Sequence, residues 1–338
     1  MAVQIHGETK RIGLALSGGG FRAAAFHLGV FRKLQALGIL WKVDLLSCVS
    51  GGSIAGAYLA ANLGDNTALD RLHEYLANRS IAVSSAVIGA LNPFTSRLDE
   101  LAKTYDSDLF HNKTLGSLSG GPRIYLNATN MSTGNMFFFV SGGGKSTEMG
   151  EWELGTTEAS DFSLAYAVAA SSAFPPVFPP LRIDRDVYPA RGVDYVTLTD
   201  GGVYDNLGVN SLLRHEHNAL DYAIVSDAGK PFEIADEPTE SGAVVVKASI
   251  DILMEQVRGL QFKRLELSWR SEEGPKPIWF SIDSPFGEQN PGDAVFASNI
   301  RTHLKKLKDE ELAILDRHAQ GLFTHRINTY APELLTAG

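Results

Sequence analysis

The 338-residue chain has a single cysteine, Cys48. One cysteine cannot form an intramolecular disulfide, nor can it supply a cysteine-rich metal site. A disulfide-stapled scaffold is therefore excluded, and a chain of this length buries enough surface to fold without such links. Basic residues are also few, with 30 Lys and Arg against 39 Asp and Glu and a net charge of −9. Proteins that bind nucleic acids neutralise phosphates with basic side chains, so no nucleic-acid partner is expected.

Long apolar runs are absent as well. The longest candidate is residues 81–91, IAVSSAVIGAL, which is far shorter than the about 20 residues that cross a bilayer. The N-terminal segment MAVQIHGETKRIG has neither the basic stretch nor the apolar run of a signal peptide. No repeat, heptad array or clear linker divides the chain. We therefore expect a soluble, cytoplasmic protein with a single domain over residues 8–338.

Short apolar runs rich in β-branched residues alternate along the chain with segments of helical periodicity. This alternation is typical of the α/β class, in which helices cover both faces of a mostly parallel sheet. The predicted strands are residues 11–16, 43–49, 123–129, 135–140, 193–198, 222–225 and 277–282. The predicted helices are residues 21–37, 53–63, 161–172, 247–267 and 293–318. Residues 80–121 are the least regular and are interpreted as an insertion or cap over the sheet.

A serine follows the second predicted strand, in the sequence Cys48-Val49-Ser50-Gly51-Gly52. A serine on a sharp turn between a strand and a helix projects its hydroxyl above the sheet, the geometry of a nucleophile elbow. Cys48 stands where the usual G-x-S-x-G pattern has its first glycine. A shifted register at Ser53 is a second imperfect match, but Ser53 would lie inside the first helical turn. Ser50 is therefore the preferred candidate nucleophile, with a plain glycine-rich turn as the alternative.

A glycine-rich loop follows the first predicted strand, in the sequence Ser17-Gly18-Gly19-Gly20-Phe21-Arg22. Three glycines beside a helix N-terminus leave backbone N–H groups open to an anion, either a phosphate or the oxyanion of acyl transfer. The loop matches neither the P-loop nor the G-x-G-x-x-G pattern. A flexible turn is the alternative interpretation.

A third motif, Asp200-Gly201-Gly202, follows the apolar run VDYVTL. Asp-Gly alone is ordinarily a turn. Together, however, the three motifs supply anion donors, a nucleophile and a base, which are the parts of a site for acyl transfer.

These motifs resemble those of the patatin-like phospholipases, whose fold is related to that of cytosolic phospholipase A2. The family's oxyanion motif matches residues 18–22, its serine elbow residues 48–52, and its D-G-[GA] motif residues 200–202. A fourth block, AASSAFPP at residues 169–176, lies between the elbow and the aspartate as it does in the family. The resemblance spans about residues 10–230. The C-terminal part, from about residue 231 to 338, carries no recognised motif and is expected to complete the domain.

The resemblance implies a three-layer α/β fold and hydrolysis of the acyl esters of phospholipids or lysophospholipids. It implies that Ser50 attacks the ester and forms an acyl-serine intermediate while Asp200 accepts the proton. Arg22 would orient the glycine loop or a phosphate. No histidine, metal or cofactor is implied. The residues implied in oxyanion or substrate binding are Gly18, Gly19, Gly20, Arg22 and Gly51.

Two other interpretations stay open at this point. One is a Ser-His-Asp esterase on an ordinary α/β-hydrolase fold, which would need a histidine after the acid. The histidines after Asp200 follow no clear strand end, and they are His215, His217, His303, His318 and His325. The other is an effector whose lipase activity is latent until a protein or small-ligand activator engages it, with the C-terminal third as the place for such control.

Two apolar segments are candidates either for contact with a membrane or partner or for packing in the core. A lipid substrate implies transient contact with a membrane surface, and residues 81–94 are the candidate because they are apolar and lie in the predicted cap. A helix that closes the core is the alternative interpretation of this segment. Within residues 247–267, apolar residues recur at helical spacing and are interpreted as a core-facing stripe. They are Ile250, Leu253, Met254, Val257 and Leu260.

Overall fold

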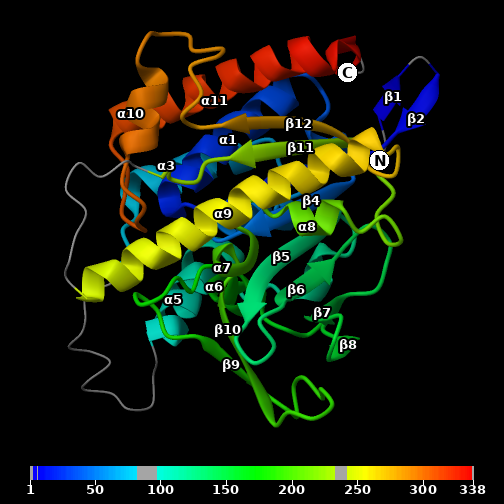
Figure 1. Cartoon of the computed structure of the whole chain (residues 1–338), viewed down its shortest axis with the longest axis vertical. Helices are drawn as coiled ribbons and strands as arrows, with labels where there is room; N and C mark the ends of the chain where they lie inside the picture. The colour runs from blue at the N-terminus through cyan, green and yellow to red at the C-terminus, as the bar shows by residue number, and fades with distance from the viewer. Residues whose placement is uncertain (1–2, 6, 82–96, 233–241, 337–338) are drawn as a thin grey trace.

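The computed structural model describes residues 3–5, 7–81, 97–232 and 242–336 of the chain (Figure 1). These residues contain a 10-stranded mixed sheet and a separate two-stranded sheet. The strand order along the main path is β12 (Lys276–Ser281), β11 (Tyr222–Asp227), β3 (Ile12–Leu16), β4 (Leu45–Val49), β5 (Arg123–Asn130), β6 (Met136–Ser141), β7 (Glu148–Glu151) and β8 (Gly155–Glu158). Off this path, β10 (Tyr195–Asp200) pairs with β5, and β9 (Leu181–Asp184) pairs with β10. The small sheet contains β1 (Val3–Ile5) and β2 (Glu8–Lys10).

The strands from β12 to β5 are parallel, and β6 to β10 extend the sheet with antiparallel pairs. The parallel part is buried on both faces, so every residue of β3 and β4 is buried rather than every second one. Two strands share β5 as a partner on the side away from β6: β4 pairs with its first residues and β10 pairs with its last. The carboxyl ends of the parallel strands meet at one edge of the sheet, where the three sequence motifs lie.

Helices cover both faces of the sheet and complete three layers. One face carries α1 (Gly20–Ala36), α2 (Gly51–Ala61), α3 (Ala68–Asn78), α5 (Arg97–Tyr105), α6 (Leu164–Ser171) and α11 (Asp309–Tyr330). The other carries α7 (Gly202–Asp205), α8 (Val209–Leu212) and α9 (Gly242–Arg270), and Figure 1 shows α9 crossing that face. The remaining elements are α10 (Asp293–Asn299), η1 (Leu40–Lys42), η2 (Asp106–Phe110), η3 (Leu115–Leu118) and η4 (Pro332–Thr336). None of the described helices is long and apolar enough to span a membrane.

The fold class predicted from the sequence is confirmed, but one predicted helix is wrong. Residues 293–318 form no single helix, because α10 ends at Asn299 and α11 begins at Asp309. The carbonyl of Ile300 accepts a hydrogen bond from Arg22 Nη1 at 2.7 Å instead of continuing the helix. His303 likewise accepts from the N–H of Phe21 at 2.9 Å. The segment between the two helices is thus held by the first turn of α1.

The predicted core-facing stripe on α9 is wrong for two of its residues. Leu253 and Leu260 are each 64% exposed, whereas Gln261 and Leu265 are the residues buried on the inner face. The spacing identified a helix correctly, and Ile250, Met254 and Val257 are partly buried, but Leu253 and Leu260 face solvent. α9 therefore presents large apolar side chains to solvent.

Candidate active site

Ser50 lies at the sharp turn between β4 and α2. Its backbone has φ 52° and ψ −116°, a conformation that non-glycine residues rarely adopt. The two residues after it must be small, because a Cβ at Gly51 would overlap the carbonyl of Gly20 and one at Gly52 would overlap that of Leu16. Such strain at a single residue is typical of functional sites. The turn leaves Ser50 half-buried at the carboxyl edge of the sheet.

Cys48, which replaces the usual first glycine of this motif, is accommodated by α2. Its side chain is fully buried and faces Gly56, where any Cβ would overlap the Cys48 sulfur. Burial raises the pKa of the Cys48 thiol, so the thiol stays neutral. The departure from the motif is thus offset by a glycine two turns into the next helix.

Asp200 ends β10 and is buried, with 1% of its surface exposed. Its Oδ1 accepts a hydrogen bond from the N–H of Gly202 at 2.7 Å. Among the described residues, its Oδ2 has no partner at ordinary hydrogen-bond geometry, although the Ser50 hydroxyl is close enough to lower the carboxyl pKa. Burial outweighs both effects and raises the pKa of Asp200 to about 7. The carboxyl group therefore has one oxygen anchored and one open beside Ser50.

The glycine loop that starts α1 has an unusual backbone. Gly19 has φ 144° and Gly20 has φ 62°, and both values favour glycine. The N–H of Gly18 donates to the carbonyl of Asn206 at 3.0 Å, so it is not open to a ligand. In the part of the chain that the structure describes, the N–H groups of Gly19, Gly20 and Gly51 donate to no other residue. Three backbone donors thus remain at the adjacent N-termini of α1 and α2.

The glycine loop and Ser50 are in close contact. A Cβ at Gly18 would lie 3.2 Å from the Cβ of Ser50 and would overlap Oδ1 of Asn206. Asn206 follows the Asp200 turn, and its Oδ1 would also lie 2.6 Å from a Cβ at Gly202. The Asn206 side chain therefore fills the space between the glycine loop and the turn of the acid.

Arg22 is fully buried and donates hydrogen bonds to two backbone carbonyls. Its Nη2 donates to the carbonyl of Ala228 at 3.0 Å, and its Nη1 donates to that of Ile300. Burial lowers the pKa of Arg22 to about 10, an effect that Asp227 opposes. These contacts tie the start of α1 to the end of β11.

Ser171 connects Ser50 to the turn that follows Asp200. Its Oγ accepts from the N–H of Ser50 at 3.1 Å and donates to the carbonyl of Asn127 at 2.6 Å. Its own carbonyl accepts from the N–H of Gly201 at 3.2 Å. Ser53, the alternative nucleophile, is buried and bonds to the same Ser171 hydroxyl at 2.7 Å. The sequence pointed to the block that contains Ser171, but only the tertiary contacts reveal what this residue does.

No histidine among the described residues hydrogen-bonds to Ser50 or Asp200. His27 binds the carbonyl of Ser17 and the hydroxyl of Ser226, both at 2.9 Å, and burial lowers its pKa to about 4. The ring nitrogens of His215, His303 and His318 contact Ser268, the N–H of Lys305 and the carbonyl of Ile282. The described residues 7–81, 97–232 and 242–336 therefore contain no Ser-His-Asp triad with Ser50 and Asp200.

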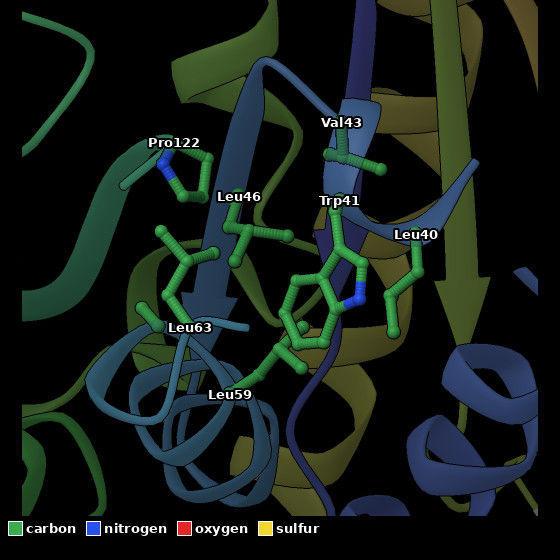
Figure 2. Close-up of a pocket in the computed structure, with 8 residues that line it drawn as sticks. Leu40, Trp41, Val43, Leu46, Leu59, Leu63 and Pro122 are labelled. Atoms are coloured by element: carbon green, nitrogen blue, oxygen red, sulfur yellow. The ribbon is translucent and has the colours of Figure 1, made fainter. Parts of the chain in front are cut away.

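Two cavities lie at opposite ends of the strands. An apolar groove of about 410 Å³ lies beside Asp200, lined in part by Thr129, Thr199 and Val203. Figure 2 shows the second, enclosed by Trp41, Leu46 and Leu59 near the amino end of β4. Its volume of about 10 Å³ leaves room for no more than about one water molecule. Of these two cavities between described residues, the groove is the one with room for a substrate.

Comparisons with known proteins bear on the fold and the family of this chain. Comparison with curated proteins returned no match. Human GIVD cytosolic phospholipase A2 has a similar fold, with a TM-score of 0.61 and 14% identity over 97% of this chain and 62% of that chain. The same human enzyme in complex with methyl gamma-linolenyl fluorophosphonate gives a TM-score of 0.58, with 15% identity over 97% of this chain and 59% of that one.

The chain therefore spans about 60% of the length of those structures, and at this identity the likeness shows the fold alone. The family model described as "Patatin-like phospholipase" matches residues 14–213, more than half of the chain, and includes the glycine loop, the serine elbow and the Asp200 turn. The chain belongs to the patatin-like phospholipase family.

Proposed function

We propose that this protein hydrolyses the acyl esters of phospholipids or lysophospholipids with a Ser50–Asp200 dyad. Family membership supports a lipid acyl hydrolase. The observation that carries the finer assignment is the strained serine beside a buried carboxyl group with one open oxygen. Three unbonded backbone N–H groups lie at the same edge of the sheet.

In the first half of the reaction, Ser50 Oγ attacks the ester carbonyl carbon and its proton passes to Asp200 Oδ2. The resulting oxyanion accepts hydrogen bonds from the N–H groups of Gly19, Gly20 and Gly51. One such donor is typically worth about 10²–10³ in kcat. The C–O bond to the alcohol then breaks, Asp200 returns the proton to the leaving oxygen, and the acyl group remains on Ser50.

In the second half, a water molecule attacks the acyl-Ser50 carbonyl and gives its proton to Asp200. Collapse of this intermediate releases the fatty acid and returns the proton to Ser50 Oγ. A carboxyl group with an ordinary pKa near 3.9 is a poor base for a hydroxyl. The raised pKa of Asp200, near 7, brings it closer to the range of an effective general base.

Gly18 and Arg22 take supporting roles in this proposal. The Gly18 N–H is bonded to Asn206, so Gly18 contributes its lack of a side chain rather than a donor. Arg22 holds the loop by its contacts with the carbonyls of Ala228 and Ile300.

Covalent labelling with a fluorophosphonate, the class of inhibitor bound to human GIVD cytosolic phospholipase A2, tests the assignment. We expect wild-type protein to be labelled at Ser50, as shown by peptide mapping, and Asp200→Asn protein to be labelled at least about tenfold more slowly. Ser50→Ala protein should show neither labelling nor hydrolysis of a short-chain ester. Full hydrolysis by Ser50→Ala protein with unchanged thermal unfolding would overturn the proposal.

We also propose that the protein is cytoplasmic and contacts membrane surfaces transiently. Residues 82–94 of the predicted membrane segment lie outside the described residues, and Ile81 is buried. Support comes instead from α9, where Val246, Leu253 and Leu260 are 61%, 64% and 64% exposed at a spacing of seven residues. Such a face can insert its side chains among lipid chains.

A further inference from the structure

An apolar groove opens beside Asp200 and has no role in the reaction steps above. Its volume of about 410 Å³ lies in the range of small-molecule sites. It lies between the turn after β5, the start of α7 and the loop after α6. Its apolar lining residues are Met131, Pro175, Phe178, Pro180, Val203 and Tyr204.

The register of β5 places this groove at the same edge of the sheet as Ser50. Val49, the residue before the nucleophile, pairs with Asn127, so the rest of β5 extends beyond Ser50. β10 runs antiparallel along this extension and ends at Asp200, opposite Ala128. In Figure 1, β10 and α7 accordingly lie together beside β5. The ends of β5 and β10 therefore extend beyond Ser50 at the carboxyl edge of the sheet.

Three hydrogen bonds connect Asp200 to residues that line the groove or adjoin its lining. Thr129 Oγ1 donates to the carbonyl of Asp200 at 2.8 Å. The N–H of Asp200 donates at 3.2 Å to the carbonyl of Ala173, two residues before Pro175. Gly202, which donates to Asp200 Oδ1, begins the helix that carries Val203. The groove therefore borders the backbone of Asp200, next to its lining residue Thr199.

The lining favours hydrocarbon over a polar head group. Thr199 Oγ1 donates to the carbonyl of Ala173 at 2.9 Å. The Asn130 side chain donates to Glu151 at 3.4 Å and accepts from the N–H of Ser132 at 2.9 Å. With these polar groups already bonded, a buried polar substituent would lose its water without gaining an equal partner. A methylene chain loses nothing of this kind and gains from burial.

We propose that the groove binds a hydrocarbon chain of the ester substrate and sets the preference for chain length. This inference rests on the proposed function. Met131 and Val203, which are 60% and 36% exposed, are the specificity-determining residues because a chain in the groove covers both. Each methylene that the groove buries should raise kcat/KM about fourfold.

Two series of esters test this and identify which chain is bound. One series lengthens the acyl chain of a p-nitrophenyl ester from two to twelve carbons. The other keeps an acetyl group and lengthens the alcohol over the same range. Met131→Trp fills the groove and Met131→Asp places a charge in it. The matched control is Val295→Trp on α10, which is 66% exposed and outside the groove.

The measured quantity is the ratio of kcat/KM for the longest to the shortest ester. We expect both Met131 variants to lower it at least about tenfold in one of the two series, and the control to leave it unchanged. A loss in the first series assigns the groove to the acyl chain, and a loss in the second assigns it to the alcohol. If the ratios are unchanged in both series while hydrolysis still depends on Ser50, the proposed chain binding in the groove is wrong. The proposed Ser50–Asp200 dyad is not affected by that result. Hydrolysis that survives Ser50→Ala instead overturns the proposed function.

Discussion

The surroundings of Asp200 give its carboxyl group the basicity that the proposed reaction requires. Its carboxyl group is removed from water but is given only one firm hydrogen bond, from Gly202. Burial disfavours the charged form, and this raises the pKa to about 7. A fully bonded carboxylate would be a weaker base, so the open oxygen beside Ser50 serves the proposed reaction.

This raised pKa predicts a pH dependence. Only the deprotonated form of Asp200 can accept the Ser50 proton, so activity requires a pH above the folded-state pKa. We expect kcat/KM for a short-chain ester to fall about tenfold for each unit below pH 7 and to level off above it. The rate of fluorophosphonate labelling should follow the same curve. A profile that stays flat down to pH 5 would contradict the prediction, because an unshifted Asp titrates near ~3.9.

At the scale of elements, the end of α6 contacts both the serine elbow at Ser50 and the Asp200-Gly201-Gly202 turn. Ser171 receives the N–H of Ser50 on its hydroxyl and the N–H of Gly201 on its carbonyl. Because Gly201 is adjacent to the acid, one residue positions the strand of the nucleophile relative to that of the base. We identify Ser171 as a positioning residue rather than a reacting one.

Substituting Ser171 tests this role against a matched neighbour. Ser171→Ala removes the acceptor of the strained Ser50 N–H, and we expect kcat for a short-chain ester to fall about tenfold with KM unchanged. Ser53→Ala removes the other hydroxyl bonded to Ser171 but leaves that acceptor in place. We therefore expect Ser53→Ala to retain kcat. Equal losses in the two variants would mean that the shared hydrogen bond acts only on stability, which thermal unfolding would report.

The exposed face of α9 gives a second prediction at this scale. Arg258 pairs with Asp227 at 2.7 Å and so fixes the middle of α9 at the end of β11, on the edge that carries the site. Leu253 and Leu260 lie on either side of this ion pair, whereas Leu267 lies further along the helix. We expect Leu253→Glu and Leu260→Glu each to weaken binding to phospholipid vesicles at least about tenfold.

The control for this experiment is Leu267→Glu, which changes the same residue type on the same helix. Leu267 is 53% exposed and lies about 21 Å from Leu253 along the helix axis. Vesicle sedimentation should show that its binding is close to wild type. If all three variants bind vesicles as the wild type does, α9 is not the membrane-contacting face.

At the scale of the whole molecule, the segment beyond the family match is part of the core. β12 pairs along the full length of β11, and α11 packs against α1. Phe280 of β12 lies between Phe26 and Phe323, with ring centroids 6.2 and 6.0 Å away. We therefore propose that residues 8–338 form one domain. The predicted protein or small-ligand activator stays a prediction, and hydrolysis of a short ester by the purified chain alone would argue against it.

Truncation tests the single domain. A protein of residues 1–230 keeps every motif and all of the matched residues 14–213 but loses β12 and α11. We expect it to be insoluble or to lack a cooperative thermal transition, because the apolar face of α1 would lie open to water. Residues 1–230 that unfold cooperatively and are labelled at Ser50 would show that the C-terminal third is a separate unit.

The sequence alone determined the fold class and the positions of the main motifs, because both depend on local residue types and spacing. The sequence predicted two strand-to-helix junctions, at Gly18 to Gly20 and at Ser50. Small residues mark such junctions because only they let the backbones of strand and helix approach each other. The alternation of apolar strands and helices predicted the class of fold, since periodicity records which faces are buried. It also identified α9 as a helix.

Long-range contacts were decided only by the tertiary structure. Periodicity could not show that α9 turns Leu253 and Leu260 to solvent, because burial depends on which neighbours arrive. The sequence could not show that the Gly18 N–H is bonded to Asn206, or that Ser171 joins the elbow to the acid. The basicity of Asp200 likewise arises from burial by segments distant in sequence. Residue types and local spacing carry the chemistry, but desolvation and hydrogen bonding between distant segments exist only once the chain has folded.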